Sequence, residues 1–282
     1  MHEQTNAFWL QREARDDVDL PPLHFAHGNS FPTGSYRVFL EHLKGRYQIH
    51  APDMLGHNPV YPVSDNWPNL CQEMIASIES IGSKQPVILL GHSLGGMLSL
   101  MVAKMRPDLV RSVLLLDSPV VAGWRVAFLK FTKLTRLIRI AGPGRFSRKR
   151  RKSWPDAASA YQHFADKEAF AIWPEQVLRD YIEFGTESYP NGVTLRFKRE
   201  IETDIYCTLP DNLRDYVEKP YPVPIGFICG TTSAECRQAG LGPTRQLVGD
   251  QFQWIEGGHL YPMESPELAA QMTMAMLEKL TK

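Results

Sequence analysis

Long hydrophobic runs are absent from this sequence of 282 residues, and no stretch approaches the ~20 apolar residues that a membrane-spanning helix needs. The first twenty residues also lack the continuous apolar segment of a secretory signal peptide. Cysteine is scarce, and its spacing shows no metal-ligand pattern: Cys71, Cys207, Cys229 and Cys236. These absences lead us to expect a cytoplasmic protein with free thiols, no metal and no cofactor.

A net charge is also lacking, because 31 Lys and Arg balance 31 Asp and Glu. This balance gives no reason to expect a nucleic-acid partner. The two signs of charge are not balanced everywhere, since no acidic residue occurs between Asp117 and Asp156. That span is strongly basic: Arg125, Lys130, Lys133, Arg136, Arg139, Arg145, Arg148, Lys149, Arg150, Arg151 and Lys152. The composition, 43% hydrophobic and 22% charged, is that of a globular chain long enough for one α/β core with an insertion.

One stretch carries a nucleophile motif. The apolar run 87–90 ends in Gly-His-Ser-Leu-Gly at 91–95, and a helix-forming run follows from Met97 to Met105. The order strand, tight turn, helix is the context that a Gly-x-Ser-x-Gly elbow requires. Glycine at both ends lets strand and helix approach closely, and the helix directs backbone N–H groups toward an oxyanion. We therefore predict that Ser93 is a nucleophile.

Four segments follow one another in a familiar order: His27-Gly28-Asn29, the 91–95 motif, Asp117 and Gly258-His259. With these segments the chain resembles the α/β-hydrolase superfamily over nearly its whole length. The resemblance implies an α/β-hydrolase fold, a mostly parallel twisted sheet flanked by helices with an inserted helical cap. We expect residues 1–117 and 222–282 to form the core and residues 118–221 to form the cap, because the insertion is too long for a loop.

Apolar runs and helical periodicity give the expected elements of this core. We predict strands at 7–10, 23–26, 47–51, 87–90, 112–116, 223–229 and 251–255, and helices at 35–43, 70–81, 97–105 and 266–280. In the insertion we predict helices at 124–140, 157–164, 174–184 and 200–207. Histidines in or beside apolar strands are expected to be structural: His24, His50 and His92.

A serine nucleophile needs a base within hydrogen-bond reach. His259 fits this role because it lies in a glycine-flanked loop after the last predicted strand, C-terminal to the serine. In similar hydrolases the residue after His-Gly and the residue after the nucleophile supply the oxyanion hole. The resemblance thus implies an oxyanion hole formed by the backbone N–H groups of Asn29 and Leu94.

The acidic member of the triad departs from the commonest pattern. Many similar hydrolases carry Asp where this chain has Ser233, which cannot bear the charge that stabilises an imidazolium. Asp117 ends the strand after the elbow, where some related esterases and dehalogenases place their acid. Glu235 is the alternative, two residues late and with a longer side chain. We prefer Asp117, with Ser233 as a hydrogen-bonding support.

The predicted helix at 124–140 has a basic amphipathic character, since it alternates cations with large apolar residues. We favour a cap helix whose apolar face covers the pocket and whose basic face is solvated or pairs with acidic core residues. A second interpretation places the helix on an anionic membrane surface. A third has the cations attract an anionic substrate, such as an acyl-CoA or an acidic lipid.

These features lead us to predict a serine hydrolase that cleaves small-molecule carboxylic esters or thioesters through an acyl-enzyme on Ser93. Serine at this position argues against haloalkane dehalogenase and epoxide hydrolase chemistry, which need an attacking carboxylate. An acyltransferase or a carbon–carbon bond hydrolase could use the same residues, and a membrane-associated lipase would follow from the basic cap. A ligand-binding protein with an idle triad is the alternative from another functional class.

Overall fold

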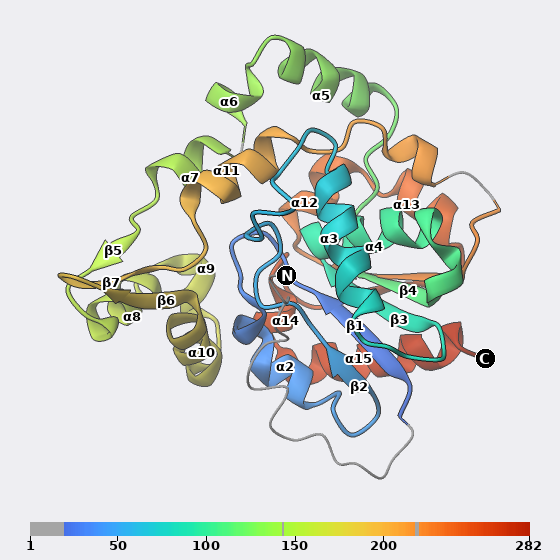
Figure 1. Ribbon diagram of the computed structural model, residues 1–282, viewed down its shortest axis with the longest axis horizontal. Helices are drawn as coiled ribbons and strands as arrows, with labels where there is room; N and C mark the ends of the chain where they lie inside the picture. Colours follow the sequence, from blue (N-terminus) through green and yellow to red (C-terminus); the bar gives the residue numbers. More distant parts are fainter. Residues whose placement is uncertain (1–19, 143, 218–219) are drawn as a thin grey trace.

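A six-stranded sheet, parallel throughout, organises the computed structural model, which describes residues 20–142, 144–217 and 220–282 (Figure 1). Its strand order is β2-β1-β3-β4-β8-β9. The strands are β1 (Pro22–Ala26), β2 (Gln48–His50), β3 (Val87–His92), β4 (Val110–Leu116), β8 (Ile225–Gly230) and β9 (Phe252–Ile255). The predicted strand at 7–10 lies outside the described residues. The predicted α/β-hydrolase fold is confirmed.

Both faces of the sheet are buried, which explains why its central strands read as nearly continuous apolar runs. Alternate side chains enter different clusters: Leu90 and Leu114 face one side, and Leu89 and Leu115 the other. The first side is covered by α2 (Arg37–Glu41), α15 (Pro266–Leu280) and the short α14 (Tyr261–Glu264). The second is covered by α3 (Pro68–Glu79), α4 (Leu94–Met105), α12 (Ala234–Ala239) and α13 (Gly242–Val248).

Most predicted core elements are found within a few residues of their expected ends, and the last helix has the predicted bounds. The predicted helix at 35–43 instead begins with a 3₁₀ turn, η1 (Thr33–Tyr36), before α2. Two further 3₁₀ turns are η2 (Pro107–Leu109) and η3 (Leu213–Tyr216). Within the described ranges, no helix is both long enough and apolar enough to cross a bilayer.

The register of the strands brings their carboxyl ends to one edge. Ala26 of β1 lies beside Gly91 of β3, and His92 of β3 lies beside Leu116 of β4. Leu116 in turn pairs with Ile228 of β8. The residues that follow these strands therefore emerge side by side, at the edge where open parallel sheets bind their ligands.

The insertion between β4 and β8 contains more than the helices that the sequence predicts. Its helices are α5 (Trp124–Leu134), α6 (Ile138–Ala141), α7 (Gly144–Lys149), α8 (Ala157–Ala165), α9 (Glu168–Ala171), α10 (Glu175–Gly185) and α11 (Arg199–Cys207). A small antiparallel sheet, not anticipated, joins them: β5 (Ser153–Trp154), β7 (Gly192–Leu195) and β6 (Thr186–Tyr189), in that order. The extended runs of this sheet are too short to show a periodicity in the sequence.

The predicted helix at 124–140 is wrong in two respects. It is broken into α5 and α6, because Arg136 adopts a left-handed φ of 59° between them. Its apolar face also does not cover a pocket, since no residue of α5 is buried. We refer to residues 121–152, which contain α5, α6 and α7, as the outer arm; α5 lies at the outer margin of the molecule in Figure 1.

Candidate active site

Ser93 occupies a sharp turn between β3 and α4. Its φ of 52° and ψ of −114° lie in a sparsely populated region, the kind of strain that functional sites store. The turn is held by its backbone N–H, which donates to the Leu116 carbonyl at 3.1 Å. A Cβ at Gly91 would collide with the Gly95 carbonyl, and one at Gly95 with the Ala26 carbonyl, so both positions require glycine. The half-buried Ser93 hydroxyl is thereby held at the edge of the sheet.

His259 connects Ser93 to Asp117. Its Nε2 lies 3.0 Å from Ser93 Oγ, and its Nδ1 lies 2.7 Å from Asp117 Oδ2. The loop that carries it precedes α14, and the Glu264 carboxylate of that helix accepts the Gly258 N–H at 2.7 Å. With Nδ1–H donating to the carboxylate, Nε2 is left to accept the serine proton.

Asp117 is fully buried, and its carboxylate accepts hydrogen bonds from several groups besides His259. Oδ1 accepts the Gly230 N–H at 2.8 Å and the Cys236 thiol at 3.3 Å. Oδ2 accepts the Ser233 hydroxyl at 2.5 Å. A buried carboxylate is tolerated only when it is paired and hydrogen-bonded in this way. The environment therefore suits a charged Asp117.

The two ionisable groups shift each other's pKa. Burial would raise the pKa of Asp117, but the hydrogen bond and charge of His259, together with Ser233 and Gly230, bring it below its ordinary value. Burial would lower the pKa of His259, but the hydrogen bond to Asp117 and the charges of Glu235 and Asp117 raise it. Both shifts favour the charged pair, which is the state in which the histidine holds a proton.

Glu235 and Ser233 have different places in this arrangement. Ser233 caps α12, where its Oγ accepts the Cys236 N–H at 3.1 Å while donating to Asp117. Glu235 lies in the first turn of the same helix with its side chain 49% exposed, and its Oε2 is 3.8 Å from His259 Nδ1. The histidine is thus hydrogen-bonded to Asp117, whereas Glu235 acts on it only through charge.

Asn29 and Leu94 lie on the two segments that border Ser93. Leu94 is the first residue of α4, where a backbone N–H has no acceptor within the helix. Asn29 follows Gly28 in a turn closed by the Phe31 N–H on the Gly28 carbonyl at 3.2 Å. The Gly95 N–H donates to the His27 carbonyl at 3.1 Å and so holds the two segments together.

A chain of hydrogen bonds behind these segments includes a residue that the sequence analysis did not single out, Tyr36. His92 Nε2 lies 2.9 Å from the His259 carbonyl, and its Nδ1 lies 2.7 Å from the Tyr36 hydroxyl. That hydroxyl accepts the Gly28 N–H at 2.9 Å. Burial lowers the pKa of His92 to about 3, so the ring is neutral. These hydrogen bonds connect the loop of His259 to the loop of Asn29. No motif in the sequence indicates this connection.

The insertion contacts this edge through a buried polar group. Arg150 pairs with Glu202 at 3.0 Å and donates to the Tyr181 hydroxyl at 2.5 Å. The Glu202 carbonyl accepts the Asn29 side-chain amide at 3.2 Å, and Phe31 packs on Tyr181 with ring centroids 5.7 Å apart. These contacts place the insertion directly over the loop that carries Asn29.

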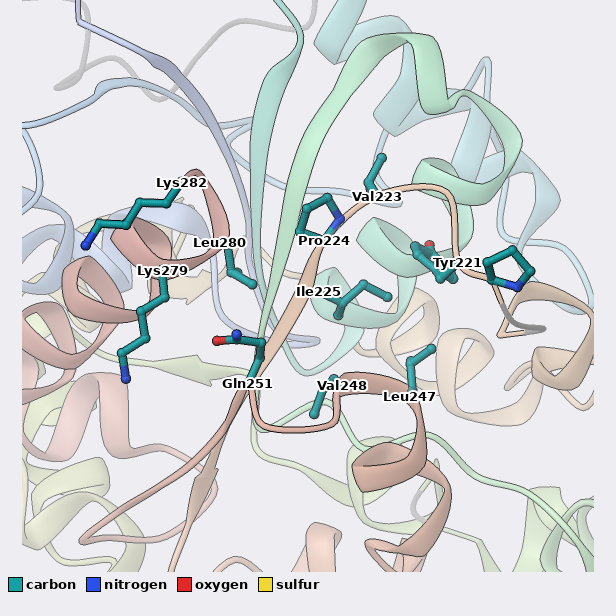
Figure 2. Close-up of a pocket in the computed structure, with 11 residues that line it drawn as sticks. Tyr221, Val223, Pro224, Ile225, Leu247, Val248, Gln251, Lys279, Leu280 and Lys282 are labelled. Carbon is teal, nitrogen blue, oxygen red and sulfur yellow. The ribbon is translucent and has the colours of Figure 1, made fainter.

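One other feature lies apart from this chemistry, and a second shares Asp117 with it. A cavity of about 510 Å³ lies at the amino end of β8, beside Pro224, Ile225 and Leu280 (Figure 2), which is the opposite edge of the sheet from Ser93. Asp117, Cys229 and Cys236 lie close enough to share a metal ion. The carboxylate of Asp117 is already taken up by hydrogen bonds, so a metal there would have to displace them.

Comparison with known proteins decides the family. The sequence profile of the Alpha/beta hydrolase family matches residues 25–272, most of the chain. The chain belongs to this family. The α/β hydrolase core is found again in solved structures: E-2-(acetamidomethylene)succinate hydrolase superimposes with a TM-score of 0.70 at 20% identity, covering 92% of this chain and 91% of that one. The thioesterase domain from the curacin biosynthetic pathway also superimposes with a TM-score of 0.70 at 20% identity. The match covers 91% of this chain and 91% of that one.

A curated relative is also a member of the hydrolases by name. The (lyso)-N-acylphosphatidylethanolamine lipase of Mus musculus is 29% identical over 119 residues, or 40% of this chain. The match spans 34% of the length of that relative, about a third. The chain is thus a member of the alpha/beta hydrolase family, and part of it is similar to a lipase.

Proposed function

We propose that this α/β hydrolase is a serine hydrolase that cleaves carboxylic esters or thioesters through an acyl-enzyme on Ser93. The observation that carries the proposal is the position of His259, with Nε2 3.0 Å from Ser93 Oγ and Nδ1 2.7 Å from Asp117 Oδ2. This is the relation of nucleophile, base and orienting acid that activates a serine hydroxyl.

In the acylation step, Ser93 Oγ attacks the carbonyl carbon of the substrate while His259 Nε2 takes its proton. The negative charge on the carbonyl oxygen is held by the N–H groups of Asn29 and Leu94, the first of these at a loop and the second at a helix N-terminus. Asp117 stabilises the imidazolium. His259 then donates its proton to the leaving oxygen or sulfur, and the carbon–leaving-group bond breaks.

In the deacylation step, water replaces the leaving group. His259 takes a proton from the water, whose oxygen attacks the acyl carbon, and the same N–H groups hold the second oxyanion. The imidazolium returns its proton to Ser93 Oγ as the acid product departs. The two steps need no metal or cofactor, because each proton passes through His259.

The test is labelling by a fluorophosphonate probe together with turnover of p-nitrophenyl esters of increasing acyl length. Wild type and Ser93→Ala are compared, with Ser99→Ala as the matched control because Ser99 is a buried serine of α4 that donates to the Gly95 carbonyl. We expect labelling and turnover to vanish in Ser93→Ala and to persist in Ser99→Ala. A folded wild type that neither labels nor turns over any ester would overturn the proposal in favour of a binding protein.

The lipase relative directs the choice of further substrates. The name of that lipase concerns an N-acylated phospholipid, so we include a lysophospholipid and a medium-chain thioester in the panel. A preference for the lysophospholipid would identify the substrate as a lipid ester. A preference for the thioester would identify the substrate as an acyl group held on a carrier by a thioester bond.

We also propose a cytoplasmic location, in keeping with four buried free thiols.

A further inference from the structure

The outer arm shows its apolar side chains to solvent. Four large residues of α5 recur at helical spacing, and their exposed fractions are 70% for Trp124, 61% for Phe128, 54% for Phe131 and 85% for Leu134. At 100° per residue, these positions fall on one face of the helix. Soluble helices normally turn such a face toward the core, so the exposed stripe on α5 is the reverse of the usual arrangement.

Polar contacts hold α5 in this orientation. Lys133 projects from the opposite face, is only 11% exposed, and pairs with Asp65 at 2.5 Å and Asp211 at 2.8 Å. Arg125 Nε donates to the Gln238 carbonyl at 2.8 Å. The helix is therefore attached to the rest of the protein by its basic residues. Its aromatic residues are left facing outward.

The exposed stripe continues beyond α5. In α6 and the segment before it, Leu137 is 41% and Ile140 is 70% exposed, and Phe146 of α7 is 67% exposed. Ile138 is the member of this series that turns inward, with 7% exposure. The outer arm thus gathers most of the large exposed apolar side chains found in the described residues.

Exposed cations surround the stripe, and the arm contains no carboxylate to offset them. In the ranges that the structure describes, no ion pair involves these exposed residues: Arg136, Arg139, Arg145, Arg148, Lys149, Arg151 and Lys152. A surface with exposed Trp, Phe and Leu among unpaired Arg and Lys is complementary to a layer with an apolar interior and anionic head groups.

We propose that the outer arm is a docking surface for anionic lipid membranes. The apolar residues of α5 enter the interface between head groups and acyl chains, and the arginines bind lipid phosphates. Trp124 follows Asp117 by only a short connection, because α5 leaves the carboxyl edge directly after β4. The outer arm therefore begins at the same edge of the sheet that carries Ser93.

The experiment is co-sedimentation of the full chain with vesicles of phosphatidylcholine alone and of phosphatidylcholine mixed with phosphatidylserine. We expect binding to the mixed vesicles that weakens with added salt, and much weaker binding to phosphatidylcholine alone. Emission from Trp124 should shift to the blue on binding, and Trp124→Leu should bind but lose most of that shift. No sedimentation with mixed vesicles at low salt would overturn the proposal.

Two variants separate the apolar from the charged contribution. Phe128→Ser with Leu134→Ser should reduce binding to mixed vesicles at least about tenfold, and Arg139→Gln with Arg145→Gln should reduce it severalfold. The matched controls are Leu268→Ser, an exposed leucine of α15, and Lys84→Gln with Lys279→Gln, which should bind like wild type. Unchanged binding in the Phe128 and Leu134 variant would overturn the proposal.

A soluble ester keeps this test separate from the proposed function. Turnover of p-nitrophenyl acetate should be the same in wild type and in the outer-arm variants, which shows that they are folded. An inactive wild type that still binds vesicles would overturn the serine hydrolase and leave the docking surface intact. Sedimentation velocity tests the remaining alternative, that the stripe binds a second copy of this chain. This alternative would hold if wild type were a dimer that does not bind vesicles and if the Phe128 and Leu134 variant were a monomer.

Discussion

The edge of the sheet that carries Ser93 and Asp117 and the outer arm are close in sequence, since Trp124 lies seven positions after Asp117. The edge buries polar groups, whereas the arm exposes apolar ones. At the edge, the Asp117 carboxylate is buried and its oxygens accept hydrogen bonds. In the arm, Phe128 and Leu134 face solvent and Lys133 faces the protein. At the edge, hydrogen bonds fix the positions of individual side chains, as a chemical reaction requires. In the arm, polar contacts fix only which face of α5 is exposed to solvent, as a docking surface requires.

The largest contrast is expected in catalysis. Asp117→Asn keeps the size of the side chain but removes the charge that orients and stabilises protonated His259, so kcat should fall by about 10⁴-fold. Phe128→Ser in the outer arm should leave kcat on a soluble ester unchanged. Steady-state turnover of a p-nitrophenyl ester measures both.

Glu235→Gln is the control for that measurement. Its carboxylate is half exposed and 3.8 Å from His259 Nδ1, too far for a hydrogen bond, so its loss should change kcat only severalfold. If Glu235→Gln were the crippled enzyme and Asp117→Asn were active, our assignment of the acid would be wrong.

A matched pair of leucines tests the contrast in stability. Leu98 of α4 is fully buried, whereas Leu134 of α5 is 85% exposed. Leu98→Ala should lower the free energy of unfolding by about 2–5 kcal/mol, because it leaves a cavity beneath the elbow. Leu134→Ala should change it by less than about 0.5 kcal/mol. Urea unfolding followed by circular dichroism measures both, and a comparable loss in Leu134→Ala would show that the exposed stripe packs against something in solution.

The two regions should also differ in their response to acid. Burial lowers the pKa of His24 to about 3 and of His27 to about 4, so both are neutral in the folded core and gain protons on unfolding below pH 6.5. The contribution of these two histidines to the free energy of unfolding is thus fully present above pH 6.5. The free energy of unfolding should fall by about 1.4 kcal/mol per pH unit for each histidine as the pH drops toward 4. The outer arm contains no histidine, so vesicle binding should show no titration of its own at any pH at which the protein stays folded.

Urea titrations at several pH values give the slope, and His24→Asn isolates one contributor. That variant should have a shallower loss of stability between pH 6.5 and 5 than wild type, even if it is less stable at pH 7. An unchanged slope would mean that His24 is not the group that takes up the proton.

The core could be predicted because its signals are local. The run before Gly91 is apolar and short, and Ser93 lies between glycines that the elbow requires. Consecutive residues therefore predict the strand, the turn and the helix. Ser233 could be placed near Asp117 because both follow strands of one parallel sheet. The closeness of Ser93 and Asp117 then follows from the register of the neighbouring strands β3 and β4.

The insertion could not be predicted to the same depth. An amphipathic helix has the same periodicity whichever face turns inward, and the orientation of α5 is decided by Asp65 and Asp211, which are far from it in sequence. The break at Arg136 leaves no Pro or Gly in the sequence to mark it. Tyr36 was missed for a related reason, since its role depends on His92 of β3, which is far from it in sequence.

The close approach of α4 to β1 limits how this protein can diverge. Any side chain at position 95 would strike the Ala26 carbonyl, so inherited variation at the elbow is confined to a narrow set of residues. The insertion leaves the core after Asp117 and rejoins it before β8, and it contributes none of Ser93, His259 or the proposed oxyanion amides. Descendants of this gene could therefore exchange α5, and with it the proposed docking surface, while Ser93, His259 and Asp117 are passed on unaltered.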